Sequence, residues 1–321
     1  MHRFLIILVG LLYLSIIIYP QSAPAPDENI PFLVTFGADS ETSWGDDDFC
    51  QIFFFMIPSS HTNPVYIRVY DPDTGGDHDE ANGDFNTTVS FSLYGGLGCW
   101  SDKDAQAHSP TGNYRSGILF SSKTFGNDLQ YNKCYYTFGP LNPSEGEYVE
   151  KFDAHVFKIV AKGESGDDGN LYRYFLSALP NENLAIEGGN VFTYKYSFRL
   201  PDDQNQVSQI YPYVDDKTIS IEVSNFDWDN DGIIKIISIA KNGVLCDVSG
   251  DDFWLSNKFP VLIEERNTTI EIQFVKNQKI KIHNNNVVVV VRNQYSLSLP
   301  FFVIPLGGAP VYTPKIMMKG L

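Results

Sequence analysis

The stretch DWDNDGIIKIISI occupies positions 227–239. Its three alternating aspartates and closing glycine can fold around a hard cation, because such an ion needs several oxygen ligands at short range. The residues that follow are β-branched, which is typical of a strand and not of the exit helix of an EF-hand. The stretch therefore predicts a calcium loop that leads into a β-strand, with Asp227, Asp229 and Asp231 as ligands.

The same strand signal runs through the chain. Phe, Tyr, Val, Ile and Thr cluster in segments of about 5–9 residues, separated by Gly, Asp, Asn and Pro. In 219–223 and 270–274, apolar and polar residues alternate, which predicts one buried and one wet face. We find no amphipathic helix pattern. The sequence therefore predicts an all-β protein of antiparallel β-sandwiches.

Composition along the chain predicts two domains. The polar segment 201–215 is expected to be a linker between a larger jelly-roll or C2-like sandwich over 31–200 and an immunoglobulin-like sandwich over 216–307. The polar stretch 95–113 is too long for a hairpin turn and is expected to run over the surface. Residues 308–321 lack a strand pattern, which predicts a flexible tail.

The N-terminus has the order of a secretory signal: a short basic region, an apolar run over 4–18, and small residues up to position 25. We expect a signal peptide over 1–22 and a secreted, periplasmic or extracellular protein. The run of about 15 apolar residues is shorter than the roughly 20 that a spanning helix needs. No membrane span is therefore expected after cleavage; an uncleaved anchor is the alternative.

Acidic residues dominate the charge balance. The chain has 39 acidic and 23 basic residues, for a net charge of −16. Such a charge repels nucleic acid and anionic membranes and attracts divalent cations. We therefore expect no nucleic-acid partner, although many of these acids would serve only to keep the protein dispersed.

Four cysteines, at positions 50, 99, 134 and 246, are compatible with disulfides in an exported protein. A bridge between Cys99 and Cys134 is the favoured pair. Buried unpaired thiols are the alternative.

A second acidic loop, DPDTGGDHDE, occupies positions 71–80. Close carboxylates repel one another by roughly 1 kcal/mol per pair near a protein surface, and a bound cation reverses the sign. We therefore predict Asp71, Asp73, Asp77 and Asp79 as further calcium ligands. A flexible turn is the alternative, because Asp and Gly are ordinary turn residues.

The later part of the loop at 227–239 departs from an EF-hand. Lys235 stands where such loops offer an oxygen at the ninth position, and Ser238 replaces the bidentate Glu at the twelfth. An incomplete loop of this kind predicts weak calcium affinity, on the order of 10⁻⁴ to 10⁻³ M.

Two tryptophans lie in predicted loops, Trp100 in the 95–113 stretch and Trp228 in the acidic loop. Exposed aromatic faces stack on sugar rings or anchor protein interfaces, so both are predicted ligand-binding residues. The alternative is that each packs onto its own sandwich.

Catalytic signatures are missing from the sequence: it has no Gly-x-Ser-x-Gly, no His-Glu-x-x-His and no phosphate-binding glycine loop. We therefore predict that the protein is not an enzyme. A Cys134–His155 pair and an unidentified pair of glycosidase acids remain alternatives.

The segment VYIRVYDPD at 65–73 resembles strand-loop segments of pre-peptidase C-terminal and C2-like β-sandwich modules in secreted bacterial proteins, and GDDGNLY at 166–172 is similar to secreted Bacteroidetes proteins. The resemblance implies an accessory binding or stabilising unit, with candidate calcium ligands in the 71–80 loop. We therefore predict an exported, non-catalytic, calcium-stabilised binding or structural protein that contacts protein or glycan at the cell envelope or outside the cell. The alternative is a carbohydrate-binding module or a carbohydrate-active hydrolase.

Overall fold

The structure, a computed structural model, describes residues 21–41, 49–106, 114–251, 253–279 and 285–314. Within these ranges the chain forms antiparallel β-strands and short 3-10 helices, which confirms the predicted all-β sandwich fold. Almost all of the predicted signal peptide, and the end of the predicted tail, lie outside the described residues. Ser22 already belongs to the first strand.

The longest sheet has nine strands. Its order is β18 (Trp254–Pro260), β15 (Ser220–Phe226), β21 (Asn286–Asn293), β12 (Tyr196–Arg199), β2 (Phe32–Phe36), β10 (Gly169–Ser177), β4 (Val65–Tyr70) and β7 (Tyr135–Leu141), with β1 (Ser22–Ala23) beside β10.

Two smaller sheets pack against this long sheet. The seven-stranded sheet has the order β22 (Phe301–Phe302), β11 (Asn190–Thr193), β3 (Cys50–Pro58), β9 (Ala154–Ser165), β5 (Thr88–Gly95) and β6 (Ile118–Phe125), with β8 (Glu147–Val149) beside β9. The four-stranded sheet has the order β13 (Val207–Ile210), β20 (Glu271–Lys276), β16 (Gly232–Ile237) and β17 (Asn242–Cys246); β14 (Tyr213–Val214) pairs with β19 (Thr268–Thr269). The 3-10 helices are η1 (Pro26–Glu28), η2 (Asp104–Gln106), η3 (Pro143–Glu145), η4 (Glu150–Phe152) and η5 (Ile263–Glu265).

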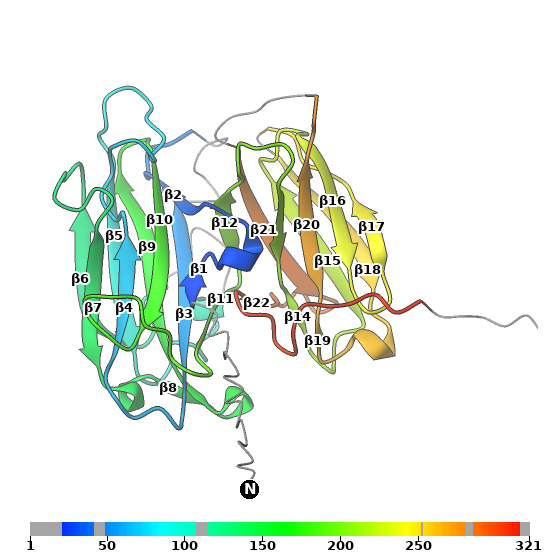
Figure 1. Cartoon of the computed structure of the whole chain (residues 1–321), viewed down its shortest axis with the longest axis horizontal. Helices are drawn as coiled ribbons and strands as arrows, with labels where there is room; N and C mark the ends of the chain where they lie inside the picture. The colour runs from blue at the N-terminus through cyan, green and yellow to red at the C-terminus, as the bar shows by residue number, and fades with distance from the viewer. Residues whose placement is uncertain (1–20, 42–48, 107–113, 252, 280–284, 315–321) are drawn as a thin grey trace, which may run out of the picture.

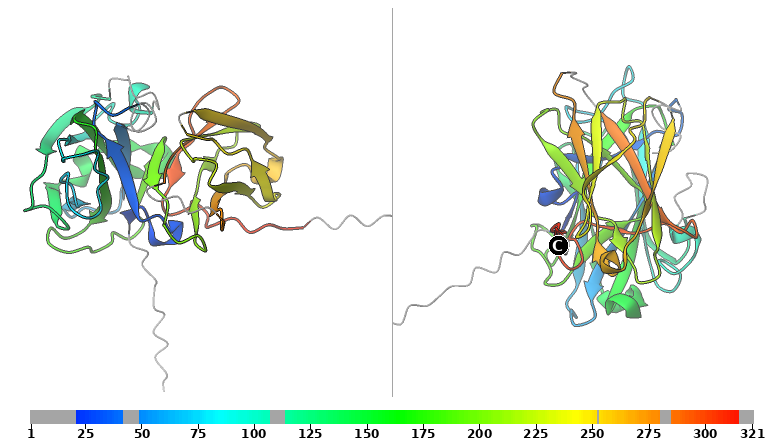
Figure 2. Two further views of the ribbon diagram at one scale, coloured as in Figure 1. Left: turned by 90° about the horizontal axis from the view of Figure 1, so that it is seen from above. Right: turned by 90° about the vertical axis from the view of Figure 1, so that its right-hand side faces the viewer.

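The molecule has two lobes that lie side by side (Figures 1 and 2). In the first lobe, alternate residues of β3 such as Phe53 and Phe55 face Tyr172 and Tyr174 of β10 in the core. In the second lobe, β15 and β21 supply apolar side chains to the same core as β16 and β20. The period-two alternation of these strands therefore produces a sandwich in each lobe.

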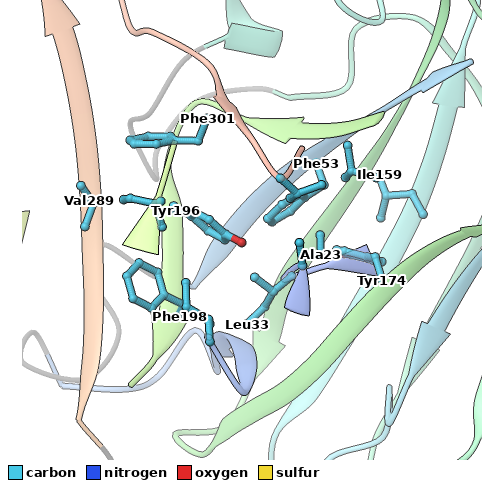
Figure 3. Close-up of a cluster of buried hydrophobic side chains, with 14 of the residues drawn as sticks. Ala23, Leu33, Phe53, Ile159, Tyr174, Tyr196, Phe198, Val289 and Phe301 are labelled. Carbon is cyan, nitrogen blue, oxygen red and sulfur yellow. The ribbon is translucent and has the colours of Figure 1, made fainter. Parts of the chain in front are cut away.

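The core continues from one lobe into the other. Phe198 of β12 lies opposite Leu33 of β2 on one side and Val287 of β21 on the other, and residues opposite each other in a sheet share a face. Figure 3 shows Leu33, Phe198 and neighbouring side chains of both lobes in one buried cluster. The two lobes are thus joined by shared hydrogen-bonded strands and shared hydrophobic packing.

This continuity differs from the predicted division into two domains. The predicted linker, 201–215, contains β13 and β14, which pair with strands of the second lobe. In addition, β22, from the predicted second domain, pairs with β11 of the first lobe. The polar composition of 201–215 therefore marks edge strands and turns.

The strand order of the second lobe explains how the lobes join. In an immunoglobulin fold the first strand lies in the same sheet as the second strand, and the last strand lies in the other sheet. Here the first strand, β13, pairs with β20, whereas the last strand, β21, pairs with β15. Because of this exchange β21 lies next to β12, and the two lobes share one sheet.

The segment after β5 covers the outer face of the seven-stranded sheet. Cys99 and Ala105 are buried there against Phe54 and Phe192. The predicted Cys99–Cys134 disulfide is wrong: all four cysteines are free, and Cys134 is exposed while Cys99 is buried. The buried Cys99 thiol instead donates to the Val156 carbonyl at 3.1 Å.

Candidate metal centre

The acidic loop after β15 is tightly coiled. Asp227, Asp229 and Asn230 have φ values of 59°, 51° and 55°, a left-handed conformation that Asp and Asn adopt more readily than most residues. At Gly232 a side chain would collide with the Val275 carbonyl, so the glycine is required for the chain to enter β16. The Asn230 N–H donates to the Ser249 carbonyl at 2.9 Å, which fixes this loop to the segment after β17.

Three carboxylates meet at this place. Oxygens of Asp227, Asp229 and Asp251 all lie within 4.8 Å of one another, with Asp251 exposed and the other two half-buried. Burial raises the pKa of the Asp229 carboxyl, and the charge of Asp251 raises it further. We call these three residues the Asp triad. Its donors are all oxygens, the ligand type that Ca²⁺ prefers.

Asp231 is not part of the Asp triad, contrary to the prediction. Its carboxylate is fully buried, 3.3 Å from the ammonium group of Lys276, and accepts a hydrogen bond from Asn285 at 3.2 Å. The reason is its position beside β16, where Gly232 pairs with Lys276 of the neighbouring strand. Asp231 therefore anchors the base of the loop, and Asp251 takes the place in the triad that was expected for it.

The first acidic loop divides its predicted ligands into two groups. Asp71, Asp73 and Asp79 point inward, the first two buried and Asp79 half-buried, whereas the Asp77 side chain is 82% exposed. Asp77 pairs with Lys133 at 2.6 Å, and this hydrogen bond lowers the pKa of Asp77. Asp77 is thus separated from the three carboxylates with which it was grouped in the prediction.

The three inward-facing carboxylates differ in the hydrogen bonds that they accept. Asp79 accepts backbone hydrogen bonds from Gly75 and Leu171 at 2.6 and 2.7 Å, and Asp71 accepts one from Lys133 at 2.6 Å. Both oxygens of Asp73 are buried, and its carboxyl group forms a hydrogen bond with that of Asp71. Burial, with the charge of Asp71 nearby, raises the pKa of Asp73 to about 7.

The two predicted ligand-binding tryptophans have different environments. Trp228 is fully buried and packs edge-on against Phe274, with ring centroids 5.1 Å apart, so it is a core residue with no face open to a ligand. Trp100 is partly buried and donates to the Tyr194 hydroxyl at 3.1 Å.

Trp100 lines a cavity between the two lobes, with a volume of about 500 Å³. The first lobe contributes Phe152 and Tyr194, and the second contributes Tyr213 and Asn293. The Lys151 ammonium group lies 5.5 Å from the centre of the Tyr213 ring. This combination of aromatic faces and a few polar groups is typical of a small-molecule site.

The prediction from sequence missed Asp251 and Tyr213 as candidate site residues. Asp251 follows Ser249-Gly250, a turn signal, but nothing in the sequence relates that turn to the loop at 227–231. Tyr213 lies in the segment that was predicted to be a linker. Both omissions arise because contacts between distant segments form these sites.

Among the described residues, no helix has the length and apolar character needed to cross a membrane. No protein-family model matches the chain, and no curated protein sequence matches it significantly. Support for a function of these sites therefore comes from their geometry and chemistry.

Proposed function

We propose that the protein is an exported, non-catalytic binding or structural protein that Ca²⁺ stabilises and that contacts protein or glycan at the cell envelope or outside the cell. The observation that supports this most is the convergence of Asp227, Asp229 and Asp251 within 4.8 Å. Three carboxylates so close repel one another, and a divalent cation would reverse that sign. Because Asp251 is exposed, water would complete the coordination, in keeping with modest affinity.

The position of the Asp triad suggests what the ion would do for the fold. Asp227 and Asp229 lie between β15 and β16, and Asp251 lies between β17 and β18. Both connections run between the long sheet and the four-stranded sheet. A cation held by the triad would therefore clamp the two sheets of the second lobe together at one end.

We expect Ca²⁺ at 100 times its dissociation constant to raise the free energy of unfolding by about 2.7 kcal/mol, because the folded state alone binds the ion. Asp251→Asn, which keeps the size of the side chain and removes its charge, should lose most of this gain. Chemical denaturation of both proteins, in chelator and in 10 mM Ca²⁺, measures the effect.

Asp216→Asn is a matched control, because Asp216 is an exposed aspartate of the same lobe outside the triad. Its response to Ca²⁺ should equal that of the wild type. If Asp251→Asn responded like this control, the triad would be an ordinary acidic turn and the proposal would be wrong.

A second candidate function, glycan binding, is favoured by the cavity at Trp100. Aromatic rings from both lobes surround it, and the amide of Asn293 and the carboxylate of Asp215 offer hydrogen-bonding groups of the kind that sugar hydroxyls need. The binding site of a carbohydrate-recognising protein would then lie between the lobes.

Glycan-array binding tests this candidate. We expect Trp100→Ala to lower the affinity for any glycan that the wild type binds by at least about tenfold, which corresponds to about 1.4 kcal/mol of binding free energy. Tyr295→Ala is the control, because Tyr295 is an aromatic residue 69% exposed that does not line the cavity. Equal loss in both variants, or no glycan bound by the wild type, would exclude the Trp100 cavity as the site.

A further inference from the structure

Hydrogen bonds hold the aromatic wall of the Trp100 cavity in place. The Trp100 indole N–H donates to the Tyr194 hydroxyl at 3.1 Å, and its backbone N–H donates to the buried Glu147 carboxylate at 2.6 Å. Its carbonyl accepts a hydrogen bond from the Gln106 amide at 2.9 Å. The cavity therefore presents an aromatic face that a ligand does not have to order first, and such preorganisation favours binding.

Two of the three charged residues that line this cavity are lysines; the three are Lys103, Lys151 and Asp215. Within the described ranges, neither lysine forms an ion pair with a carboxylate. The Lys151 ammonium group instead lies 5.6 Å from the centre of the Phe152 ring and 5.5 Å from that of the Tyr213 ring. Both rings belong to the cavity wall, so positive charge is available to a ligand bound there.

The Asp215 carboxylate is held by its own turn and pairs with neither lysine. One of its oxygens accepts hydrogen bonds from the Lys217 N–H at 3.1 Å and from the Thr218 hydroxyl at 2.6 Å. A carboxylate fixed in this way can accept further hydrogen bonds from sugar hydroxyls, as the amide of Asn293 can also do. The cavity thus combines groups for sugar hydroxyls with two ammonium groups for an anion.

Positive charge also exceeds negative charge next to this cavity. A smaller hollow of about 150 Å³ shares Asn293 and Ser296 with it. The charged residues of the hollow are Glu222, Lys258 and Arg292, and Glu222 lies 3.2 Å from the Lys258 ammonium group and 3.8 Å from the Arg292 guanidinium group. One carboxylate thus faces two cations in each hollow, although the whole chain has a net charge of −16. This local excess favours an anionic ligand group.

We infer that the ligand of the Trp100 cavity is an acidic glycan, and that a carboxylate or sulfate group of one sugar pairs with Lys103 and Lys151. The inference rests on the glycan-binding candidate proposed above and names its ligand class. Hydrogen bonds from an ammonium group to an anionic oxygen are stronger than those between neutral groups, so the two lysines select acidic sugars over neutral ones. The negative charge of the chain as a whole repels anions, which restricts acidic ligands to places where cations outnumber carboxylates.

Binding of the full-length protein to an array of neutral, carboxylated and sulfated glycans at low salt tests the ligand class. We expect the bound glycans to be acidic, and comparison of the carboxylated and sulfated sets shows which anionic group is preferred. The glycan that binds most tightly should lose at least about tenfold in affinity when its carboxylates are reduced or its sulfates removed, because its hydrogen bonds to charged groups are lost. High salt should reduce this difference, because it screens the charges.

Lys151→Met keeps the apolar stem of the side chain and removes its charge. It should lower the affinity for the acidic glycan by at least about tenfold and leave the affinity for the neutral form unchanged. Lys103→Met should act in the same direction. Lys123→Met is the matched control, because the Lys123 ammonium group also lies over two aromatic rings, 5.6 Å from that of Phe125 and 5.8 Å from that of Tyr131, but does not line the cavity. This control should bind both forms as the wild type does.

The possible outcomes distinguish failure of this inference from failure of the glycan-binding candidate. Neutral glycans that bind, lose affinity in Trp100→Ala and keep it in Lys151→Met would overturn the inference and leave the candidate standing. Acidic glycans bound equally by the wild type, Lys103→Met and Lys151→Met would lie elsewhere on the protein, which would also overturn the inference. If the wild type bound no glycan, both would be wrong.

Discussion

Replacement of Lys276 by methionine is expected to lower the free energy of unfolding by about 3–5 kcal/mol. The ammonium group lies 3.3 Å from a carboxylate oxygen of Asp231 and donates to the Pro201 carbonyl at 3.2 Å, and both side chains of the ion pair are at most 2% exposed. Methionine retains the apolar stem but leaves Asp231 as an uncompensated buried charge. Chemical denaturation at pH 7 measures the loss.

Two further variants separate the charge effect from packing. Lys235→Met changes a half-buried lysine on the adjacent strand β16 and should alter stability by no more than about 0.5 kcal/mol. Asp231→Asn combined with Lys276→Met should recover much of the loss, because no buried charge remains. A loss below about 1 kcal/mol in Lys276→Met would mean that the pair behaves as an exposed ion pair, contrary to the geometry described above.

The second large effect is expected from Glu28, which is buried in the shared core. Its carboxylate accepts hydrogen bonds from the Tyr196 hydroxyl and the Ala25 N–H, both at 2.7 Å, while its other oxygen has no partner. Figure 3 shows the Tyr196 hydroxyl pointing into the buried hydrophobic cluster that the two lobes share. Burial raises the pKa of Glu28 to about 8.

This pKa has a definite consequence for stability. Between about pH 4.5 and 8 the folded protein keeps a proton that the unfolded chain releases, so the stabilisation present at low pH is lost as the pH rises. Each pH unit over which the folded and unfolded states differ by one bound proton changes the free energy of unfolding by about 1.4 kcal/mol. The loss of stability across this window therefore approaches roughly 4 kcal/mol. Glu28→Gln carries no charge at any pH and should remove this part of the pH dependence.

Unfolding free energies at pH 5, 6, 7 and 8 test the expectation for wild type and Glu28→Gln. As the pH rises, the free energy of unfolding of Glu28→Gln should increase steadily relative to that of the wild type. Glu187→Gln, at an exposed position, should follow the wild type. Parallel curves for wild type and Glu28→Gln would show that Glu28 titrates normally in the folded protein.

Local sequence determined the secondary structure and the shape of the loops. The β-branched run after Gly232 forms β16, and alternation in 219–223 and 270–274 placed Ile221, Val223, Ile270, Ile272 and Phe274 in the core. Ile219, which shares this pattern, precedes β15 and is 54% exposed. These outcomes were predictable because strand side chains alternate between faces, so a period-two pattern states which residues are buried. Asp, Asn and Gly likewise permit the left-handed turns seen at 227–232.

The sequence could not determine which strands pair or where loop side chains point. Strand β21 is apolar on both faces, and it pairs with both β15 and β12, so the lobes share one core where a linker and two domains were predicted. A buried strand has partners on both edges, and a one-dimensional pattern of hydrophobicity does not specify them.

The candidate sites depend on the tertiary structure for the same reason. Asp231 has the spacing of a calcium ligand, but Lys276 on the adjacent strand draws it into the interior, and Asp251, twenty residues later, completes the triad. Trp228 lies in an acidic loop and is nevertheless a core residue, because Phe274 of β20 packs against its ring. Local sequence thus fixed which residue types were available for chemistry, whereas contacts between distant strands decided which of them converge, since a side chain's charge and burial depend on neighbours that the chain brings together only on folding.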